Sequence, residues 1–160
     1  MSLHSSIPTN IIITKEQAID YRMAFYNTGK ACKYGHFANR YVSNRQCVTC
    51  NAEKARFNES RRAVNDPTYR MFRNVQRRAG QALNGIYSPL KALACNQVKL
   101  GQYIEAQFKE GMCWEKYGQW EVDHIIPLSA ANDSVNIIKL CNYQNLQPLW
   151  KRENRKKGGA

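Results

Sequence analysis

Apolar residues recur at helical spacing near the start of the chain, after a polar and unpatterned stretch over residues 1–10 that we expect to be a frayed tail. Thr14 and Gln17 have the spacing of a capping box, in which the two side chains satisfy each other's backbone amides. The apolar positions that follow predict a helix that Gly29 can end. These positions are Ala18, Ile19, Met23, Ala24 and Tyr26.

Two more helices are predicted where a capping residue precedes a proline. Asp66-Pro67 and Ser88-Pro89 both place proline at the first helical position, where its missing N–H costs nothing. The second of these helices is short and runs through Ala94. The first has an apolar stripe of Tyr69, Phe72, Val75, Ala79 and Leu83. Helix-compatible segments also cover 52–63 and 103–108.

Beyond residue 119 the pattern changes from helical spacing to short strands. Residues 120–126 alternate and then become apolar, which predicts a buried strand ending near Asp123-His124. Residues 145–150 are a second strand candidate, in which Pro148 favours an edge position or an irregular turn. Residues 151–157 have helix-forming composition, and Gly158-Gly159 ends that helix. The predicted fold class is α+β and mainly helical.

Composition narrows the class of partner. The 160 residues carry 24 Lys+Arg against 12 Asp+Glu, a net charge of +12, so we expect a polyanion, nucleic acid rather than a membrane. A protein that is merely basic is the alternative. No run of 18 apolar residues exists, and MSLHSSIPTN does not resemble a secretory signal. Six cysteines in such a chain indicate a reducing compartment, where thiols more often bind metal than form disulfides.

Four metal-ligating residues fall close together in the loop-rich segment 31–51. Cys32, His36, Cys47 and Cys50 form two close pairs within 19 positions. Three thiolates and one imidazole complete a tetrahedral zinc shell, so the spacing predicts a closed, structural Zn²⁺ site. Free buried cysteines beside an unrelated histidine are the alternative. For the separate cysteines Cys95, Cys113 and Cys141 we expect buried, packing roles.

A second group of polar residues follows the predicted C-terminal strands. The segment reads WEVDHIIPLS, then a loop, then CNYQNLQPLWKRENRKKGG. These residues resemble the HNH endonucleases, which share the ββα-metal fold. The resemblance is closest to small phage-encoded members with an N-terminal Cys/His zinc knuckle. It covers residues 120–158 and, more loosely through TGKACKYGH and CVTC, residues 29–50.

The resemblance implies a role for each of four residues. His124 is the expected general base, Asp123 and Asn154 the ligands of a catalytic divalent ion, and Asn145 the residue that orients the base. Asn154 stands where some members have histidine. The residue types suit this chemistry independently, because a histidine titrating near neutral pH can take a proton from water. Oxygen ligands suit Mg²⁺ or Mn²⁺, which are the expected catalytic cofactors.

Two basic segments are candidate DNA contacts. Arg70, Arg73 and Arg77 have the spacing of a single helical face and can follow a phosphate backbone. The second segment surrounds Asn154, and its cations can bind the phosphates that flank the cleaved bond. Its cations are Lys151, Arg152, Arg155, Lys156 and Lys157. Solvated helix faces are the alternative for both segments.

Together these expectations describe three regions. Residues 1–63 form an N-terminal helix and zinc-knuckle module, 64–110 a helical DNA-binding region, and 111–160 the HNH motif. The implied function is metal-dependent hydrolysis of DNA to 5′-phosphate and 3′-hydroxyl ends, with DNA as partner and a homodimer left open. The alternatives are a zinc-containing DNA-binding protein without catalysis, and a nuclease for RNA or branched DNA. The expected location is the cytoplasm of a bacterial host, for a phage-encoded protein.

Overall fold

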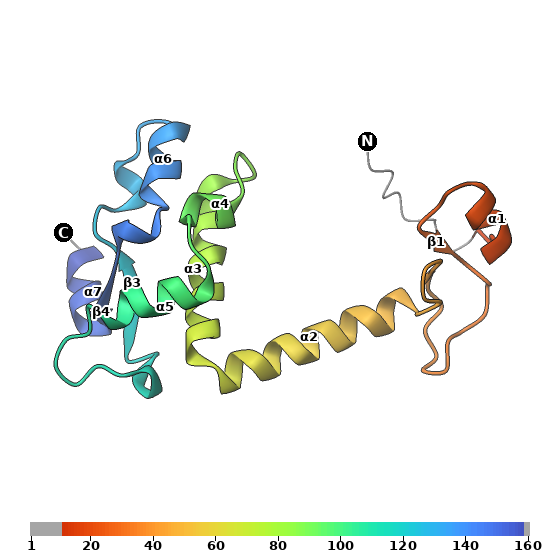
Figure 1. Cartoon of the computed structure of the whole chain (residues 1–160), viewed down its shortest axis with the longest axis horizontal. Helices are drawn as coiled ribbons and strands as arrows, with labels where there is room; N and C mark the ends of the chain where they lie inside the picture. Colours follow the sequence, from red (N-terminus) through yellow and green to blue (C-terminus); the bar gives the residue numbers. More distant parts are fainter. Residues whose placement is uncertain (1–10, 159–160) are drawn as a thin grey trace. The chain divides into compact units, whose positions relative to one another are not determined.

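The computed structural model of the protein describes residues 11–158. The chain divides into two compact units, one ending at Arg61 and the other beginning at Arg62. Helices and two small antiparallel sheets make up these units (Figure 1), which confirms the predicted α+β, mainly helical fold class. The expectations for residues 1–10 and for Gly159 lie outside the described residues.

The first helix, α1 (Lys15–Asp20), begins with the predicted capping box. Thr14 Oγ1 accepts from Gln17 N at 3.2 Å, and Gln17 Oε1 accepts from Thr14 N at 2.9 Å. Ala18, which is fully buried, anchors the helix to its unit. The start of this helix is therefore set by local side-chain chemistry that the sequence displays.

The predicted extension of α1 toward Gly29 is wrong. Arg22 adopts a left-handed conformation with φ of 53°, its N–H donates to Ile19 O, and Met23 N donates to Ala18 O. These two bonds form a Schellman motif, which ends a helix by satisfying its last carbonyls. An arginine occupies the position where glycine is usual, so the stop signal was not visible in the sequence.

A small sheet follows where the helix was expected. Strand β1 (Phe25–Tyr26) pairs antiparallel with β2 (Arg40–Tyr41), and Arg40 also forms a bridge with Cys47. The Phe25 and Tyr41 rings lie 5.2 Å apart. Strands of two residues are too short to show an alternating pattern. The sheet closes the loop that carries Cys32 and His36, and the bridge from Arg40 brings Cys47 to the base of that loop.

The helix predicted over 52–63 is longer than expected. Helix α2 (Val48–Asn65) has 18 residues and none of them is buried. It begins at Val48, inside the segment assigned to the knuckle. A helix with no packed face depends on the helix propensity of its residues and on interactions between charged side chains. Charged side chains occur throughout α2.

The second unit is built around α3 (Pro67–Leu83), which begins as predicted. Asp66 caps it by accepting from Tyr69 N at 2.8 Å, and Pro67 occupies the first turn. The fully buried positions are Met71, Val75, Ala79 and Leu83, one residue every four. The predicted apolar stripe is confirmed at Val75, Ala79 and Leu83, which are buried. Its other two members, Tyr69 and Phe72, are only half-buried, and the buried face includes Met71 instead.

Three shorter α-helices pack around this core. Helix α4 (Pro89–Leu93) follows the predicted start. The helix expected over 103–108 is instead α5 (Gln97–Glu105), capped by Asn96, and α6 (Ser134–Leu140), capped by Asp133, was not predicted. Both caps are residues that sequence reasoning passed over. Three single turns of 3₁₀ helix complete the unit: η1 (Trp114–Lys116), η2 (Leu128–Ala130) and η3 (Tyr143–Asn145).

The two predicted C-terminal strands are present and form one antiparallel pair. Strand β3 (Trp120–His124) pairs with β4 (Leu146–Trp150), so that Trp120 lies opposite Trp150 and His124 opposite Leu146. Helix α7 (Lys151–Gly158) follows β4 directly and packs on both strands (Figure 1). The sheet has two strands, so Pro148 lies on an edge strand as expected.

One hydrophobic core joins the whole second unit. It contains the buried face of α3 together with Leu100 and Ile104 of α5 and Trp120 and Val122 of β3. Trp120 is fully buried, and its ring contacts those of Phe108, Trp114 and Tyr117. The segments 64–110 and 111–160, which the sequence analysis separated, therefore share one core and lie in one unit.

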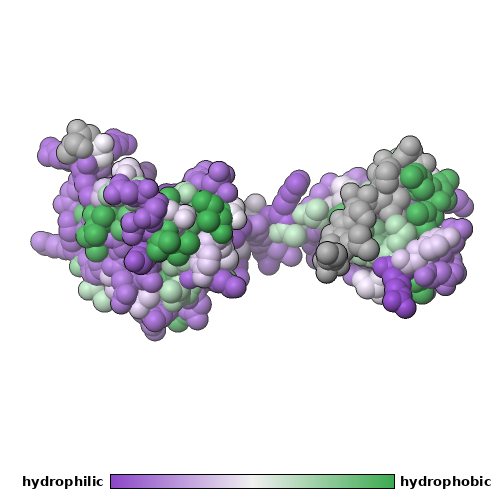
Figure 2. Space-filling model, turned by 90° about the horizontal axis from the view of Figure 1, so that it is seen from above, coloured by the Kyte–Doolittle hydropathy of each residue, from purple (hydrophilic) through white to green (hydrophobic). Residues whose placement is uncertain are grey.

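The surface is polar, as the charge requires. Figure 2 shows a face that is largely hydrophilic, with separate hydrophobic patches on both units. Over residues 11–158, no helix is both long and apolar enough to cross a membrane.

Candidate functional site

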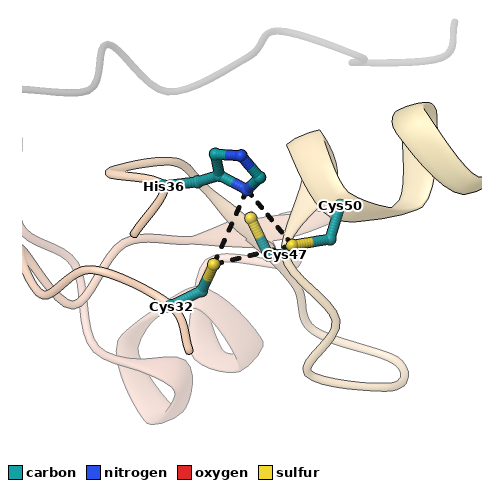
Figure 3. A group of neighbouring side chains, drawn as sticks. All are labelled: Cys32, His36, Cys47 and Cys50. Carbon is teal, nitrogen blue, oxygen red and sulfur yellow. Dashed lines mark hydrogen bonds between the residues drawn. The ribbon is translucent and has the colours of Figure 1, made fainter. Parts of the chain in front are cut away.

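The four predicted zinc ligands lie together in the first unit. Their ligand atoms are all within 4.8 Å of one another (Figure 3). Cys50 Sγ lies 3.5 Å from Cys32 Sγ and 3.2 Å from His36 Nδ1, and Cys32 Sγ lies 3.7 Å from His36 Nδ1. The structure thus brings the complete predicted set to one point, and this Cys₃His cluster could hold a metal ion such as zinc.

Local backbone geometry positions each pair of ligands. Between Cys32 and His36 the chain makes a tight turn, in which Gly35 N donates to Cys32 O at 2.9 Å and Cys32 N donates to His36 O at 3.0 Å. Gly35 has φ of +86°, a conformation that favours glycine. Cys47 directly precedes α2 and Cys50 lies in its first turn, where the positive end of the helix dipole favours thiolates.

The cluster is electrostatically unfavourable without a cation. Burial and the neighbouring sulfurs of Cys32 and Cys47 raise the pKa of Cys50 to about 12. Burial also raises the pKa of Cys32, but backbone N–H donors at Tyr34 and His36 and the neighbouring thiols outweigh it and lower that pKa to about 6. Three thiolates cannot all form here unless a cation removes their mutual repulsion.

His36 has a partner on the side of its ring away from the sulfurs. Its Nε2 lies 3.4 Å from Glu53 Oε1, while its Nδ1 faces Cys32 and Cys50. Metal-bound histidines usually give their second ring nitrogen to a carboxylate in this way, because that bond fixes the tautomer and the ring orientation. Glu53 was not among the predicted site residues.

The other cysteines lie outside this cluster. Cys141 is buried in the core of the second unit, as expected, and burial raises its pKa. Cys95 and Cys113 are half-buried rather than buried, and Cys95 packs against the same core.

A second polar group lies where α7 covers β3 and β4. Strand residues Glu121 and Asp123 share one face of β3, because side chains alternate along a strand. Asn154 Nδ2 donates to Glu121 Oε2 at 3.0 Å, and Lys157 Nζ lies 2.5 Å from Asp123 Oδ2. Gln147, opposite Asp123 in the sheet, has its amide nitrogen 3.5 Å from the same oxygen. We call these five residues the β3–α7 polar cluster.

Lys157 is the centre of an oxygen-lined position. Its ammonium group is within hydrogen-bond distance of Asp123 Oδ2, of the backbone oxygen of His124 and, at 3.1 Å, of the backbone oxygen of Ile125. A positive charge is therefore held by one carboxylate and two carbonyls. Lys157 was predicted as a DNA contact, and the structure places it on the carboxylate predicted as a metal ligand.

Asn145 holds the segment that follows His124. Its Oδ1 accepts from Ile126 N at 2.9 Å, and its Nδ2 donates to Ile126 O at 2.9 Å and to Leu140 O at 2.8 Å. The backbone adds a bond from Ile125 N to Asn145 O at 2.7 Å. One amide side chain thus connects the end of β3 with the end of α6.

His124 is the last residue of β3 and is half-buried. Burial is the main cause that lowers its pKa, and the positive charges of Arg78 and Lys157 lower it further, against the opposite effect of Asp123. Arg78 comes from α3 and donates to the backbone oxygen of Val122 at 2.8 Å. The pKa of the imidazole is therefore held below its usual value, in a field to which one carboxylate and two cationic groups contribute.

The predicted DNA-contacting cations divide into exposed and engaged groups. Arg70 donates to Tyr117 O at 3.0 Å and its guanidinium lies 5.2 Å from the Tyr117 ring centre, so it packs within the unit. Lys151 Nζ lies 4.0 Å from Glu121 Oε1. Arg73 is exposed but its Nη1 donates to Gln76 Oε1 at 3.2 Å, and the exposed Lys157 contacts Asp123. The other exposed members of the two basic segments are Arg77, Arg152, Arg155 and Lys156.

Sequence reasoning missed Glu121, Arg78 and Gln147 as neighbours of the predicted site. Glu121 could have been found from the sequence, because a residue two positions before Asp123 on a strand lies on the same face of the sheet. Gln147 and Arg78 had none, since their placement depends on strand register and on the packing of α3.

Comparison with known proteins gives one viral relative. No protein-family model matches the chain, and no solved structure matches it. The chain is 31% identical over 110 residues to the uncharacterized protein L426 of Acanthamoeba polyphaga mimivirus. The match covers 65% of this chain and 48% of that protein, so the chain spans about half the length of this relative.

Proposed function

We propose that the protein is a metal-dependent DNA endonuclease of the HNH type, with a structural zinc ion on Cys32, His36, Cys47 and Cys50. The observation that carries the nuclease proposal is the set of oxygens around Lys157 Nζ, supplied by the Asp123 carboxylate and two backbone carbonyls. This donor set is one that a hard divalent cation prefers, and it already holds a positive charge.

Asp123 and Asn154 would hold the divalent ion, Mg²⁺ or Mn²⁺. Asn154 and Lys157 lie on the same face of α7, and their partners Glu121 and Asp123 lie on the same face of β3. Because the Asn154 side-chain nitrogen donates to Glu121, its amide oxygen is the atom that would coordinate the metal ion. The ion, when bound, stabilises the negative charge that develops on a phosphate under attack.

His124 would act as the general base. Its lowered pKa keeps a ring nitrogen free of its proton near pH 7, and that nitrogen accepts a proton from water. The water oxygen forms a bond to phosphorus, the bond from phosphorus to the 3′ oxygen breaks, the 3′ oxygen takes a proton from solvent water, and His124 returns its proton to solvent. The products are a 5′-phosphate and a 3′-hydroxyl, and atoms and charge balance.

Two features support the remaining assignments. Asn145 contacts the backbone on both sides of the loop after His124, which suits a residue that orients the base. Exposed cations on α3 and α7, including Arg77, Arg152, Arg155 and Lys156, would contact phosphates, and Arg73 would do so by exchanging its bond to Gln76. The viral relative fits a viral origin. We further propose that the protein is phage-encoded and acts in the cytoplasm of a bacterial host.

The test is a plasmid-nicking assay on zinc-loaded, full-length protein dialysed free of loosely bound metal. Supercoiled plasmid is expected to be nicked or linearised on addition of Mg²⁺ or Mn²⁺ and to stay intact without them. Leaving the divalent ion out, rather than adding a chelator, avoids stripping the zinc. His124→Ala is expected to lower the rate by about 10²- to 10⁴-fold, the usual contribution of a general base.

Matched variants separate catalysis from binding. Asp123→Asn is expected to abolish cleavage, whereas Asp20→Asn, at an exposed aspartate in α1, keeps it. Gel-shift affinity for the same DNA is expected to persist in His124→Ala. Full cleavage by His124→Ala would contradict the assignment of the base. DNA binding without cleavage under every metal would favour the non-catalytic zinc-containing DNA-binding protein instead.

A further inference from the structure

The first unit contains a cavity that the metal cluster does not account for. Its volume is about 890 Å³, and all its lining residues fall between Cys32 and Phe57. This volume is in the range of small-molecule sites, about 300–1,000 Å³, far above the needs of one metal ion. The cavity therefore has room for a ligand beside the four metal-ligating side chains.

The lining is strongly basic. Lys33, Arg40, Arg45 and Lys54 line the cavity, and Glu53 is the acidic residue among the lining side chains. Glu53 is also the residue whose carboxylate lies 3.4 Å from His36 Nε2, so it serves the cluster. The excess of positive charge favours an anionic ligand.

Two aromatic rings of the lining are open to solvent. Tyr34 is 67% exposed and Phe57 65% exposed. The ammonium group of Lys33 lies 4.8 Å from the centre of the Tyr34 ring. Exposed rings among cations form the surface that binds unpaired bases, because bases stack on the rings while the backbone phosphates pair with the cations. A duplex keeps its bases stacked on one another, so their flat faces are not open to a protein ring.

We propose that this cavity binds single-stranded nucleic acid. Unpaired bases stack on Tyr34 and Phe57, and the adjacent phosphates contact the basic residues of the lining, Lys33, Arg40, Arg45 and Lys54. This site is separate from the expected DNA contacts, which all belong to the second unit. It requires the folded knuckle but no divalent catalytic ion, so it stands independently of the nuclease proposal.

The test is fluorescence anisotropy with full-length, zinc-loaded protein in the absence of Mg²⁺ and Mn²⁺. The probes are a labelled twelve-nucleotide dT strand, a uridine strand of the same length and a twelve-base-pair duplex. Tyr34→Ala and Phe57→Ala are each expected to weaken single-strand binding about fivefold to 100-fold, the range for loss of one stacked base. Binding of the duplex is expected to be unchanged. The dT and uridine arms show whether the strand is DNA or RNA.

Phe37→Ala is the matched control. Phe37 is an aromatic residue of the same segment and is 74% exposed, but it does not line the cavity. Its replacement is expected to leave single-strand affinity unchanged. Lys54→Ala is expected to reduce the slope of log affinity against log salt by about 0.7, the value for one phosphate contact on a single strand. Zinc content is measured for every variant, so that loss of folding is recognised.

Three results would overturn the proposal. They are equal losses of single-strand and duplex affinity in Tyr34→Ala and Phe57→Ala, equal losses from Phe37→Ala and Tyr34→Ala, and single-strand binding that is indifferent to both cavity rings in variants with full zinc. None of these results bears on cleavage of plasmid by His124 and Asp123. A failure here is therefore distinguishable from a failure of the nuclease proposal.

Discussion

The two candidate sites are assembled in opposite ways. The Cys₃His cluster collects four ligands from 19 positions of the first unit, through one glycine turn and the first turn of α2. The β3–α7 polar cluster joins residues from Glu121 to Lys157 across a strand pair and a helix. The first is built by local backbone geometry, and the second depends on the packing of the second unit.

The sites also differ in charge compensation. At the first site, burial and then the neighbouring sulfurs raise the pKa of Cys50 to about 12, so that site needs an external cation to become fully ionised. The second holds its own cation, the Lys157 ammonium, against Asp123. A cluster that needs a metal ion to form is suited to a structural role, whereas a self-compensated one can exist without metal and exchange its cation when substrate arrives.

The largest expected effect comes from removing a zinc ligand, and it is confined to the stability of the first unit. Cys47→Ser is expected to reduce bound zinc from one equivalent to none and to unfold the knuckle, because structural zinc sites contribute about 10–16 kcal/mol. All three tryptophans, Trp114, Trp120 and Trp150, lie in the second unit, so their fluorescence unfolding curve is expected to remain unchanged. Zinc analysis and urea titration check both statements.

Cys95→Ser is the control for that experiment. Cys95 lies in the second unit and outside the cluster, so this variant is expected to keep its zinc. One equivalent of zinc still bound by Cys47→Ser would show that the ligand set is wrong.

The next largest effect concerns Asn145 in the second unit. Asn145→Ala removes three side-chain hydrogen bonds to the backbone and is expected to cost about 1–3 kcal/mol per polar group left unsatisfied, less where water replaces the partner. Urea unfolding followed by tryptophan fluorescence measures it. Asn145→Asp, which keeps the acceptor for Ile126 N but loses both donor bonds, is expected to be destabilised as well. A stability equal to that of the unmodified protein in both variants would contradict the bracing role.

A smaller effect is expected at the cap of α3. Burial raises the pKa of Asp66, but hydrogen bonds from Thr68, Tyr69 and Gln97 outweigh it and hold that pKa below its usual value. Asp66→Ala is expected to cost about 1 kcal/mol at pH 7. Because the folded-state pKa is depressed, this stabilisation is present above pH 3.8 and is lost as pH falls through the folded value. Urea titrations at pH 7 and pH 3 measure the difference, which should shrink at the lower pH.

The smallest effect sharpens the contrast between the two sites. Lys157→Met removes the cation that Asp123 holds, so Mn²⁺ is expected to bind about fivefold more tightly without DNA, the equivalent of a partly exposed ion pair. Titration calorimetry measures the affinity. Lys156→Met, at an exposed neighbour on α7, is the control and is expected to have no effect of this kind. Identical Mn²⁺ affinity in both variants would mean that Lys157 does not compete for the position.

Most local elements could be predicted where a few adjacent residues decide the conformation. The Thr14–Gln17 capping box and the Asp66-Pro67 start are such cases, and so is the strand that ends at His124. The errors arose where the deciding residue is atypical or distant. Arg22 ends α1 in a conformation usual for glycine, and the two-residue strands β1 and β2 exist only because they pair with each other.

The amino-acid sequence by itself determined the identity and the spacing of the Cys₃His ligands, because a metal site closed by two short pairs depends on local chain geometry. It also determined which polar residues end the C-terminal strands. Only the tertiary structure decided that Lys157 pairs with the Asp123 carboxylate, that Asn154 contacts Glu121 and that Arg78 donates to the backbone oxygen of Val122. The physical reason is that the register of β3 with β4 and the docking of α3 and α7 follow from burial of one shared core, and no local pattern encodes which charged side chains that core brings together.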